Sequence, residues 1–161
     1  MGAIYSDEYF NERYNLFSKE LYSVAYGYTL NKADAEDIVQ DVFMKYLKLH
    51  KEFPTLDDEK YYLIRMTINE ALNFIKRNKK VVYNDEVVSY TPDQLSEKNR
   101  VLLHMVNDLP DKYRDIIMLS FYKSYSDEFI SSVLKISKAL VRKRRERALE
   151  ILRKEYKHEW H

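Results

Sequence analysis

The stretch DAEDIVQDVF (residues 34–43) sorts its apolar and polar side chains onto two sides of a predicted helix. The apolar members recur every three or four residues, which is the spacing of one buried helical face. Asp37, Gln40 and Asp41 fall on the opposite side and share an exposed patch. Because the stretch contains no His or Cys, a metal site is not expected, and the patch is either a solvated helix face or a docking surface for another protein. The apolar members are Ala35, Ile38, Val39, Val42 and Phe43.

Apolar side chains continue at helical spacing on both sides of this stretch. One stripe precedes it, and another follows it from Ile64 to Ile75. Pro54 interrupts the pattern, and TLDDE (55–59) is predicted to be a loop before the third helix. Residues 1–80 are therefore predicted to form one three-helix domain.

Residues 81–98 lack a sustained helical period and include Pro92 and several Asp, Asn and Ser residues. A structureless stretch of this length is unusual inside a compact domain, so it is predicted to be a linker between two domains. Short paired strands at VVY and EVV are a weaker alternative. Residues 99–161 are predicted to form four short helices. The fold class is therefore all-α: two small helical domains joined by a linker, the second ending in a helix–turn–helix.

The composition limits the classes of function. With 2 Gly and 3 Pro in 161 residues, the chain has too few turn formers for an all-β fold, and without Cys it forms no disulfide or thiolate metal site. No apolar run approaches the ~20 residues of a membrane span, and the N-terminus lacks a signal-peptide pattern. We therefore expect a cytoplasmic protein that does not attach to membranes. Without a phosphate-binding loop or a nucleophile motif, no cofactor, metal or catalytic residue is expected.

Positive charge gathers near the C-terminal end of a chain whose net charge is only +1. Between Lys138 and Arg147 there are six basic residues and one acid. The cluster lies on the second of two short predicted helices, which Ser126 and Ser137 are expected to cap, and this arrangement is typical of a DNA-binding helix–turn–helix. A solvated basic face is the plainer alternative. The residues expected nearest to the bases are Lys138, Ala139, Leu140, Arg142 and Lys143.

The segment YYLIRMTINEALNFIKRNKK (61–80) interleaves basic and amide residues with aromatic ones. Cations that follow a phosphate backbone and rings that stack on bases suit single-stranded DNA. Alternatively, Phe74 and one of the tyrosines belong to the core or its rim. The residues in question are Tyr61, Tyr62, Arg65, Asn69, Asn73, Lys76, Arg77 and Lys80.

Together with LPDKYRDIIMLSFYKSYS (109–126), these segments resemble the extracytoplasmic-function sigma factors, the smallest members of the bacterial sigma-70 family. The resemblance extends from about residue 10 to residue 155, and DAEDIVQDVF is its most specific part. It implies that the first domain binds the clamp helices of core RNA polymerase and captures the melted minus-ten promoter strand. It also implies that a flipped-out base is held by the loop around residues 51–60.

The resemblance further implies that the second domain, residues 99–161, binds the minus-thirty-five duplex and sits on the polymerase flap. Many relatives are also held by an anti-sigma factor. The implied core-binding residues are Asp37, Gln40 and Asp41. The implied minus-ten residues are Tyr61, Tyr62, Arg65, Asn69, Asn73, Lys76 and Arg77. The implied minus-thirty-five residues are Ser137, Lys138, Ala139, Leu140, Arg142 and Lys143.

The sequence departs from the family pattern at four places. Arg145 replaces a leucine at a core-facing position, so its charged end must reach polar surroundings or the helix must rotate. These departures predict a divergent minus-thirty-five sequence. The other three are Tyr62 for a tryptophan, Lys135 for a glycine before the second helix, and Phe129-Ile130-Ser131 for E-I-A.

Two other functions fit parts of the sequence. A helix–turn–helix regulator that does not join the polymerase would explain the basic cluster, but it has no need of DAEDIVQDVF followed by a basic aromatic helix. A hydrolase would need one of the four histidines to have a partner at motif spacing, and none has one. Two of these histidines, His158 and His161, close the chain.

Overall fold

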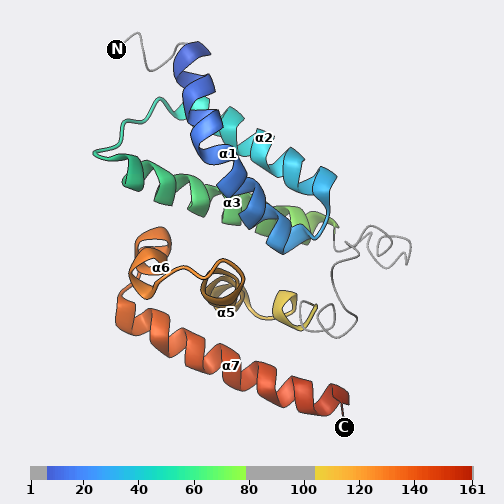
Figure 1. Cartoon of the computed structure of the whole chain (residues 1–161). Helices are drawn as coiled ribbons and strands as arrows, with labels where there is room; N and C mark the ends of the chain where they lie inside the picture. The colour runs from blue at the N-terminus through green and yellow to red at the C-terminus, as the bar shows by residue number, and fades with distance from the viewer. Residues whose placement is uncertain (1–6, 79–103, 161) are drawn as a thin grey trace. The chain divides into compact units, whose positions relative to one another are not determined.

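A computed structural model describes residues 7–78 and 104–160, and these residues form helices with no strand among them. The chain divides into two compact units, Met1–Tyr90 and Thr91–His161 (Figure 1). The predicted all-α fold class is therefore confirmed. The predicted linker and its alternative strand pair lie outside the described residues.

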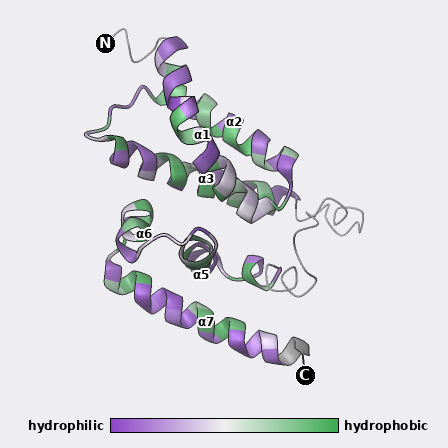
Figure 2. Ribbon diagram, viewed as in Figure 1, coloured by the Kyte–Doolittle hydropathy of each residue, from purple (hydrophilic) through white to green (hydrophobic). Residues whose placement is uncertain are grey.

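The first unit is a three-helix bundle of α1 (Asp7–Thr29), α2 (Lys32–Leu49) and α3 (Leu56–Asn78), in which each helix packs against the other two. The apolar stripes of the sequence meet in its centre. Figure 2 shows that hydrophobic and hydrophilic residues alternate along each of these helices. This agrees with the helical spacing of the stripes. The largest fully buried side chains include Leu21, Val24, Val42, Phe43, Leu63, Ile64 and Ile68.

The loop between α2 and α3 is shorter than predicted. The Thr55 hydroxyl accepts a hydrogen bond from the Asp58 backbone N–H at 3.0 Å and donates to the Asp58 carboxylate at 2.9 Å. This reciprocal capping starts the helix at Leu56. The prediction that TLDDE is wholly loop is therefore wrong, because its acidic residues form the first turn, where the helix dipole favours negative charge.

A buried carboxylate ties the three helices of the first unit together. Glu59 of α3 is 3% exposed. Arg13 of α1 donates through Nε to both of its oxygens, at 3.1 and 3.2 Å, and the Tyr46 hydroxyl of α2 donates to the same group. These partners compensate the cost of burying the charge. Burial, together with the bond to Glu59, raises the pKa of Tyr46 above its ordinary value.

The second unit contains α5 (Asp111–Ile117), the π-helical turn η3 (Met118–Tyr122), α6 (Asp127–Leu134) and α7 (Lys138–Trp160). Helix α7 packs against both α5 and α6. It was predicted to be short, and it is 23 residues long. No Gly or Pro follows Ser137, and the Lys, Arg, Glu and Leu residues of the segment favour helix. The Ser137 hydroxyl caps α7 as predicted, accepting from the Leu140 N–H at 3.0 Å.

Arg114 joins the start of the second unit to α5. The residue is 6% exposed, and its side chain donates from Nη2 to the backbone carbonyl oxygens of Asn107 and Leu109. Asn107 is the last of the helical residues 104–107 and Leu109 follows them, at a helix end where carbonyls have no partner within the helix. The arginine of the L-P-x-x-x-R segment therefore has a structural role.

The turn between α6 and α7 keeps its geometry without the glycine. Lys135 adopts the left-handed conformation, with φ 57° and ψ 47°, and its N–H donates to the Ser131 carbonyl. The Ile136 N–H donates to that carbonyl at 3.2 Å, and the Ser131 hydroxyl donates to the Ile136 carbonyl. Two of the departures from the family pattern, Ser131 and Lys135, thus meet in one hydrogen-bonded turn.

Candidate functional site

The outward face of α2 carries the predicted docking patch. Asp37, Gln40 and Asp41 are all exposed. Met44, which follows Asp41 by three residues, is 57% exposed and extends the patch with an apolar side chain. Sequence reasoning missed Met44, although its position outside the apolar stripe was a usable signal. A face of acidic and amide groups beside one adaptable apolar side chain suits protein docking.

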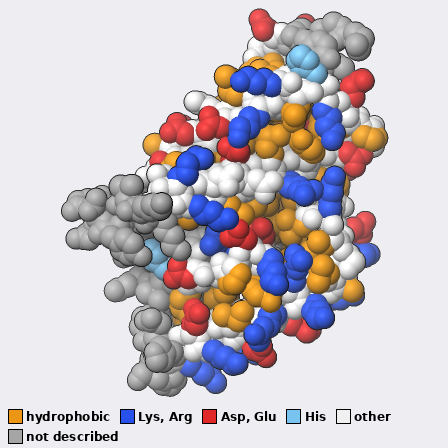
Figure 3. Space-filling view, turned by 180° about the vertical axis from the view of Figure 1, so that it is seen from behind, with side chains coloured by type: hydrophobic (Ala, Val, Ile, Leu, Met, Phe, Trp, Pro, Cys, Tyr) orange, Lys and Arg blue, Asp and Glu red, His pale blue; other side chains and the backbone are white. Residues whose placement is uncertain are grey.

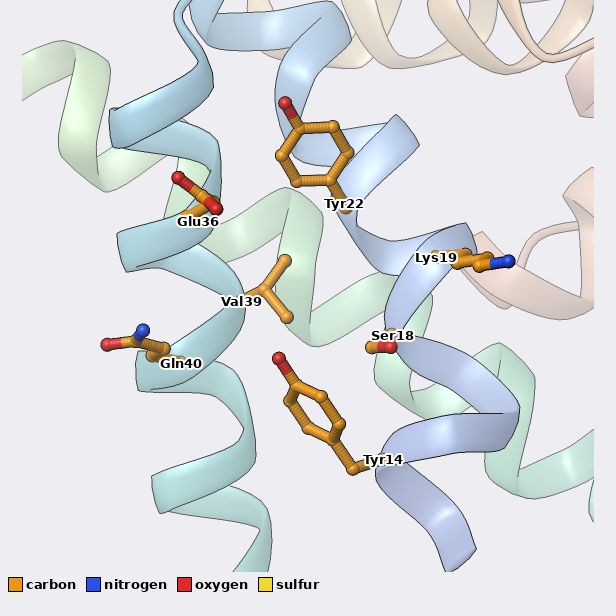
Figure 4. A pocket seen from close by; sticks show the side chains of 7 residues that line it. All are labelled: Tyr14, Ser18, Lys19, Tyr22, Glu36, Val39 and Gln40. Atoms are coloured by element: carbon orange, nitrogen blue, oxygen red, sulfur yellow. The ribbon is translucent and has the colours of Figure 1, made fainter. Parts of the chain in front are cut away.

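A pocket of about 270 Å³ opens beside this patch, between α1 and α2. Tyr14 and Tyr22 of α1 and Glu36 and Gln40 of α2 surround Val39 (Figure 4). Gln40 therefore belongs both to the pocket wall and to the exposed face. The two together form one continuous surface of the first unit.

Acidic side chains crowd the N-terminal part of α2. Burial, and then the nearby charge of Asp37, raise the pKa of Asp34 above its ordinary value. The Asn31 side chain caps this end, accepting from the Asp34 N–H at 2.9 Å. This end of α2 therefore has the electrostatic character to attract a basic partner.

The predicted minus-ten residues of α3 divide into two groups. Five of them are exposed and recur at steps of four, four, three and one, which places them on one side of the helix. Tyr61 and Tyr62 are only half-buried, and Tyr62 packs on Phe53 with ring centroids 5.2 Å apart. The Lys51 ammonium lies 4.7 Å from the Tyr62 centroid. The exposed five are Arg65, Asn69, Asn73, Lys76 and Arg77.

A second pocket of about 270 Å³ lies at the loop before α3. Its lining includes Tyr9 and Arg13 of α1, Phe53 of the loop, and Glu59 of α3. The Arg13–Glu59 ion pair fixes two of these walls. The pocket therefore combines aromatic surfaces with charged hydrogen-bonding groups.

The basic residues of α7 differ in whether they form ion pairs. Lys138, Arg142 and Lys143 are exposed and make no ion pair within the described part of the chain. Arg145, in contrast, donates to Asp127 of α6 and, at 3.2 Å, to the Ser120 hydroxyl. Lys138, Arg142 and Lys143, which are both exposed and without an ion pair, are the cations predicted to meet DNA.

Arg145 starts from a core-facing position, but its charged end reaches the polar partners Asp127 and Ser120, as the sequence requires. Its hydrogen bond to Asp127 lowers the pKa of that carboxyl below the ordinary value, and the charges of Arg142 and Lys138 act in the same direction. Asp127 also lies in the first turn of α6, where the helix dipole favours its charge. We call this three-residue contact of Ser120, Asp127 and Arg145 the α6–α7 clasp.

The remaining predicted residues of α7 differ in their surroundings. Ala139 is exposed, Leu140 is half-buried, and the Ser137 hydroxyl is engaged as the helix cap. On the face of the molecule in Figure 3, Lys and Arg side chains are interspersed with hydrophobic and acidic ones. No group of three metal-ligating side chains occurs among the described residues, and no described helix is long and apolar enough to cross a membrane.

Comparison with protein families identifies both units. Residues 14–81 match the model of Sigma-70 region 2, and residues 99–152 match that of Sigma-70, region 4. The two matches together span most of the chain, which therefore belongs to the sigma-70 family.

Individual relatives place the chain among the extracytoplasmic-function (ECF) sigma factors. It is 27% identical to the RNA polymerase sigma factor SigV of Bacillus subtilis (strain 168), over 84% of this chain and 83% of SigV. It is 26% identical to the ECF RNA polymerase sigma factor SigM of the same organism, over 80% of this chain and 83% of SigM.

Solved structures show the same fold. The sigma factor RpoE from Bartonella quintana, crystallised with the anti-sigma factor NepR, matches 92% of this chain and 96% of its own, with a TM-score of 0.62 and 22% identity. CnrH, solved with the cytosolic domain of CnrY, matches 98% of this chain and 94% of its own, with a TM-score of 0.66 and 18% identity.

Proposed function

We propose that this sigma factor joins core RNA polymerase through the outward face of α2 and binds promoter DNA with α3 and α7. The family function is promoter-specific initiation of transcription. The surfaces described above support the residue assignments that the family resemblance implies. The observation that carries the proposal is the presence, in one chain, of an acidic docking face and a separate face of unpaired cations.

The face of Asp37, Gln40, Asp41 and Met44 is the proposed contact with the clamp helices of the polymerase. Its acidic groups favour a basic partner surface, and Met44 adds apolar area that water would otherwise cover. The pocket beside Gln40 lengthens this contact toward α1. A DNA-binding regulator that does not join the polymerase would not explain this exposed acidic face.

The exposed side of α3 is the proposed surface for the melted minus-ten strand. Arg65, Lys76 and Arg77 supply cations for the backbone, while Asn69 and Asn73 supply donors and acceptors for base edges. The pocket at the loop before α3 is proposed to hold one unstacked base against Phe53 and Tyr9. Phe53 of the loop and Tyr9 of α1 then serve as aromatic walls of the pocket.

The helix–turn–helix of α6 and α7 is the proposed contact with the minus-thirty-five duplex. Lys138, Arg142 and Lys143 lie at the N-terminal end of α7, and this end of a recognition helix approaches the bases. The second unit is also proposed to bind the polymerase flap. Binding and strand capture require no covalent step, no metal and no cofactor.

The chain is further proposed to act in the cytoplasm, where the bacterial polymerase works, and to catalyse no reaction. An anti-sigma factor is a third proposed partner. Two structural relatives were solved as complexes, RpoE with NepR and CnrH with CnrY. Such a partner would inhibit by covering the faces of α2 or α7.

Run-off transcription tests the proposal. The protein is added to sigma-free core polymerase on genomic fragments, and we expect discrete transcripts whose start sites share an upstream sequence. Duplex binding without transcripts and without co-migration with core would favour the regulator that does not join the polymerase.

The docking face has its own test. Reversing the charges of Asp37 and Asp41 to lysine is expected to abolish co-migration with core, because like charges then oppose the partner surface. Circular dichroism checks that the helices remain. The matched control reverses Asp7 and Glu8, exposed acids in the first turn of α1, and is expected to co-migrate normally. Normal holoenzyme formation by the Asp37/Asp41 variant contradicts the assignment.

A further inference from the structure

The outward face of α7 contains an acidic residue, Glu146, among its basic residues. Ala139, Arg142, Lys143 and Glu146 are all exposed, and they occupy positions i, i+3, i+4 and i+7 of the helix. Residues at this spacing form the single strip that a recognition helix presents to base edges in the major groove. Glu146 is thus an acid within the strip expected to meet DNA.

Glu146 differs from two neighbouring acids in having no partner. Asp127 is paired with Arg145, and Glu150 is paired with Arg147. Within residues 7–78 and 104–157, the Glu146 side chain takes part in no ion pair or hydrogen bond, although Arg142 and Lys143 lie one turn before it. Its carboxylate is therefore available to accept hydrogen bonds from a ligand.

The orientation of this strip is fixed by the opposite side of α7. Val141 and Ala148 are fully buried there, at 0% exposure. The α6–α7 clasp holds Arg145, the residue just before Glu146, against Asp127 and Ser120. Rotation of α7 would break these contacts, so Glu146 faces outward in the folded domain.

A carboxylate in this strip needs a hydrogen-bond donor, because DNA phosphates repel it. In the major groove, cytosine presents its exocyclic amino group, which is the natural donor to a glutamate. Guanine presents two acceptors at that edge, and thymine presents an acceptor and a methyl group. Adenine also has an amino donor, but its N7 acceptor lies beside that donor and a carboxylate has no proton to give to it. The chemistry of the groove therefore favours cytosine opposite Glu146 over the other three bases.

We infer that Glu146 is a specificity-determining residue, which accepts a hydrogen bond from the amino group of one cytosine in the duplex that α7 contacts. The inference rests on the proposed role of the second unit in duplex binding. It adds an acid to a contact set that sequence reasoning limited to Ser137, Lys138, Ala139, Leu140, Arg142 and Lys143.

Selection of duplexes from a random library by the full-length protein tests this role without polymerase. The wild-type protein is expected to select a site with one strongly preferred cytosine. Glu146→Ala is expected to reduce the preference at that position about tenfold while leaving other positions unchanged. Glu150→Ala, on the same helix one turn further, is the matched control and is expected to keep the wild-type profile.

Three results would overturn the inference. The first is an identical base profile for the wild-type protein and Glu146→Ala. The second is tighter binding of Glu146→Ala to every duplex without a change of profile, which would limit Glu146 to repelling phosphates. The third is a wild-type protein that selects no site. Co-migration with core is measured on the same preparations, so failure of polymerase binding is seen separately from failure of base selection.

Discussion

Each unit contains an arginine–carboxylate pair that joins two helices, and the two pairs lie in different surroundings. Glu59 of the first unit is 3% exposed and receives three hydrogen bonds from Arg13 and Tyr46. In the second unit, the side chains of Arg145 and Asp127 are 22% and 29% exposed. Water screens the second pair and reaches little of the first. We therefore expect the arginine–carboxylate pair to be required for the stability of the first unit, and the corresponding pair in the second unit to contribute much less.

Glu59→Ala tests the buried side of the comparison and has the largest expected effect. It removes the carboxylate that the Arg13 guanidinium and the Tyr46 hydroxyl share, and leaves them only Glu12 and Tyr9, so we expect a loss of about 3 kcal/mol in the free energy of unfolding. Urea unfolding of the full-length protein, followed by circular dichroism, measures it. Glu52→Ala, the same change at an exposed glutamate, should alter stability by less than about 0.5 kcal/mol. Equal effects of the two changes would contradict the structural role of Glu59.

Lys135→Gly tests whether the backbone of the turn between α6 and α7 lowers the stability of the second unit. Lys135 adopts positive φ, which costs a residue with a Cβ about 1 kcal/mol and costs glycine almost nothing. The variant is therefore expected to be more stable by about 1 kcal/mol, in the same urea experiment. Lys135→Ala keeps the Cβ and should resemble the wild-type protein. A glycine variant no more stable than the alanine variant would show that the turn is unstrained.

Asp127→Asn addresses the exposed pair and has the smallest expected effect. Because Arg145 lowers the pKa of Asp127, the ionised form stabilises the fold at neutral pH. That contribution, less than about 1 kcal/mol, is lost as the pH falls below 3.8 and through the lower folded-state pKa. The stability difference between the wild-type protein and Asp127→Asn should therefore shrink with acidification. A difference that is constant with pH would exclude the ion pair as its cause.

The sequence predicted best where one local pattern decides the outcome. The 34–43 stretch alone predicts the buried side of α2 and the exposure of Asp37, Gln40 and Asp41, because helical spacing determines both. The start of α3 was misplaced because Pro54 and the acids after it suit a loop and a first helical turn equally well. Met44 was missed because single apolar residues on a surface are common.

Contacts between segments that are distant in the chain could not be predicted from the sequence. Arg13 and Glu59 are 46 residues apart, and Arg145 and Asp127 are 18 apart, so no local spacing connects them. The left-handed conformation of Lys135 was likewise hidden, since lysine has no preference for positive φ. The two ion pairs depend on tertiary contacts, whereas the turn at Lys135 depends on local hydrogen bonds with Ser131 and Ile136.

The hydrogen bond from Tyr46 to Glu59 also sets a limit at alkaline pH. Burial and this bond raise the pKa of Tyr46, so the folded first unit keeps that phenol protonated after exposed tyrosines have ionised. The unfolded chain ionises it near the ordinary value of 10.0, so stability is lost as the pH rises above that value. In an ultraviolet titration of phenolate absorbance, the delayed ionisation of Tyr46 would report the alkaline opening of the three-helix bundle.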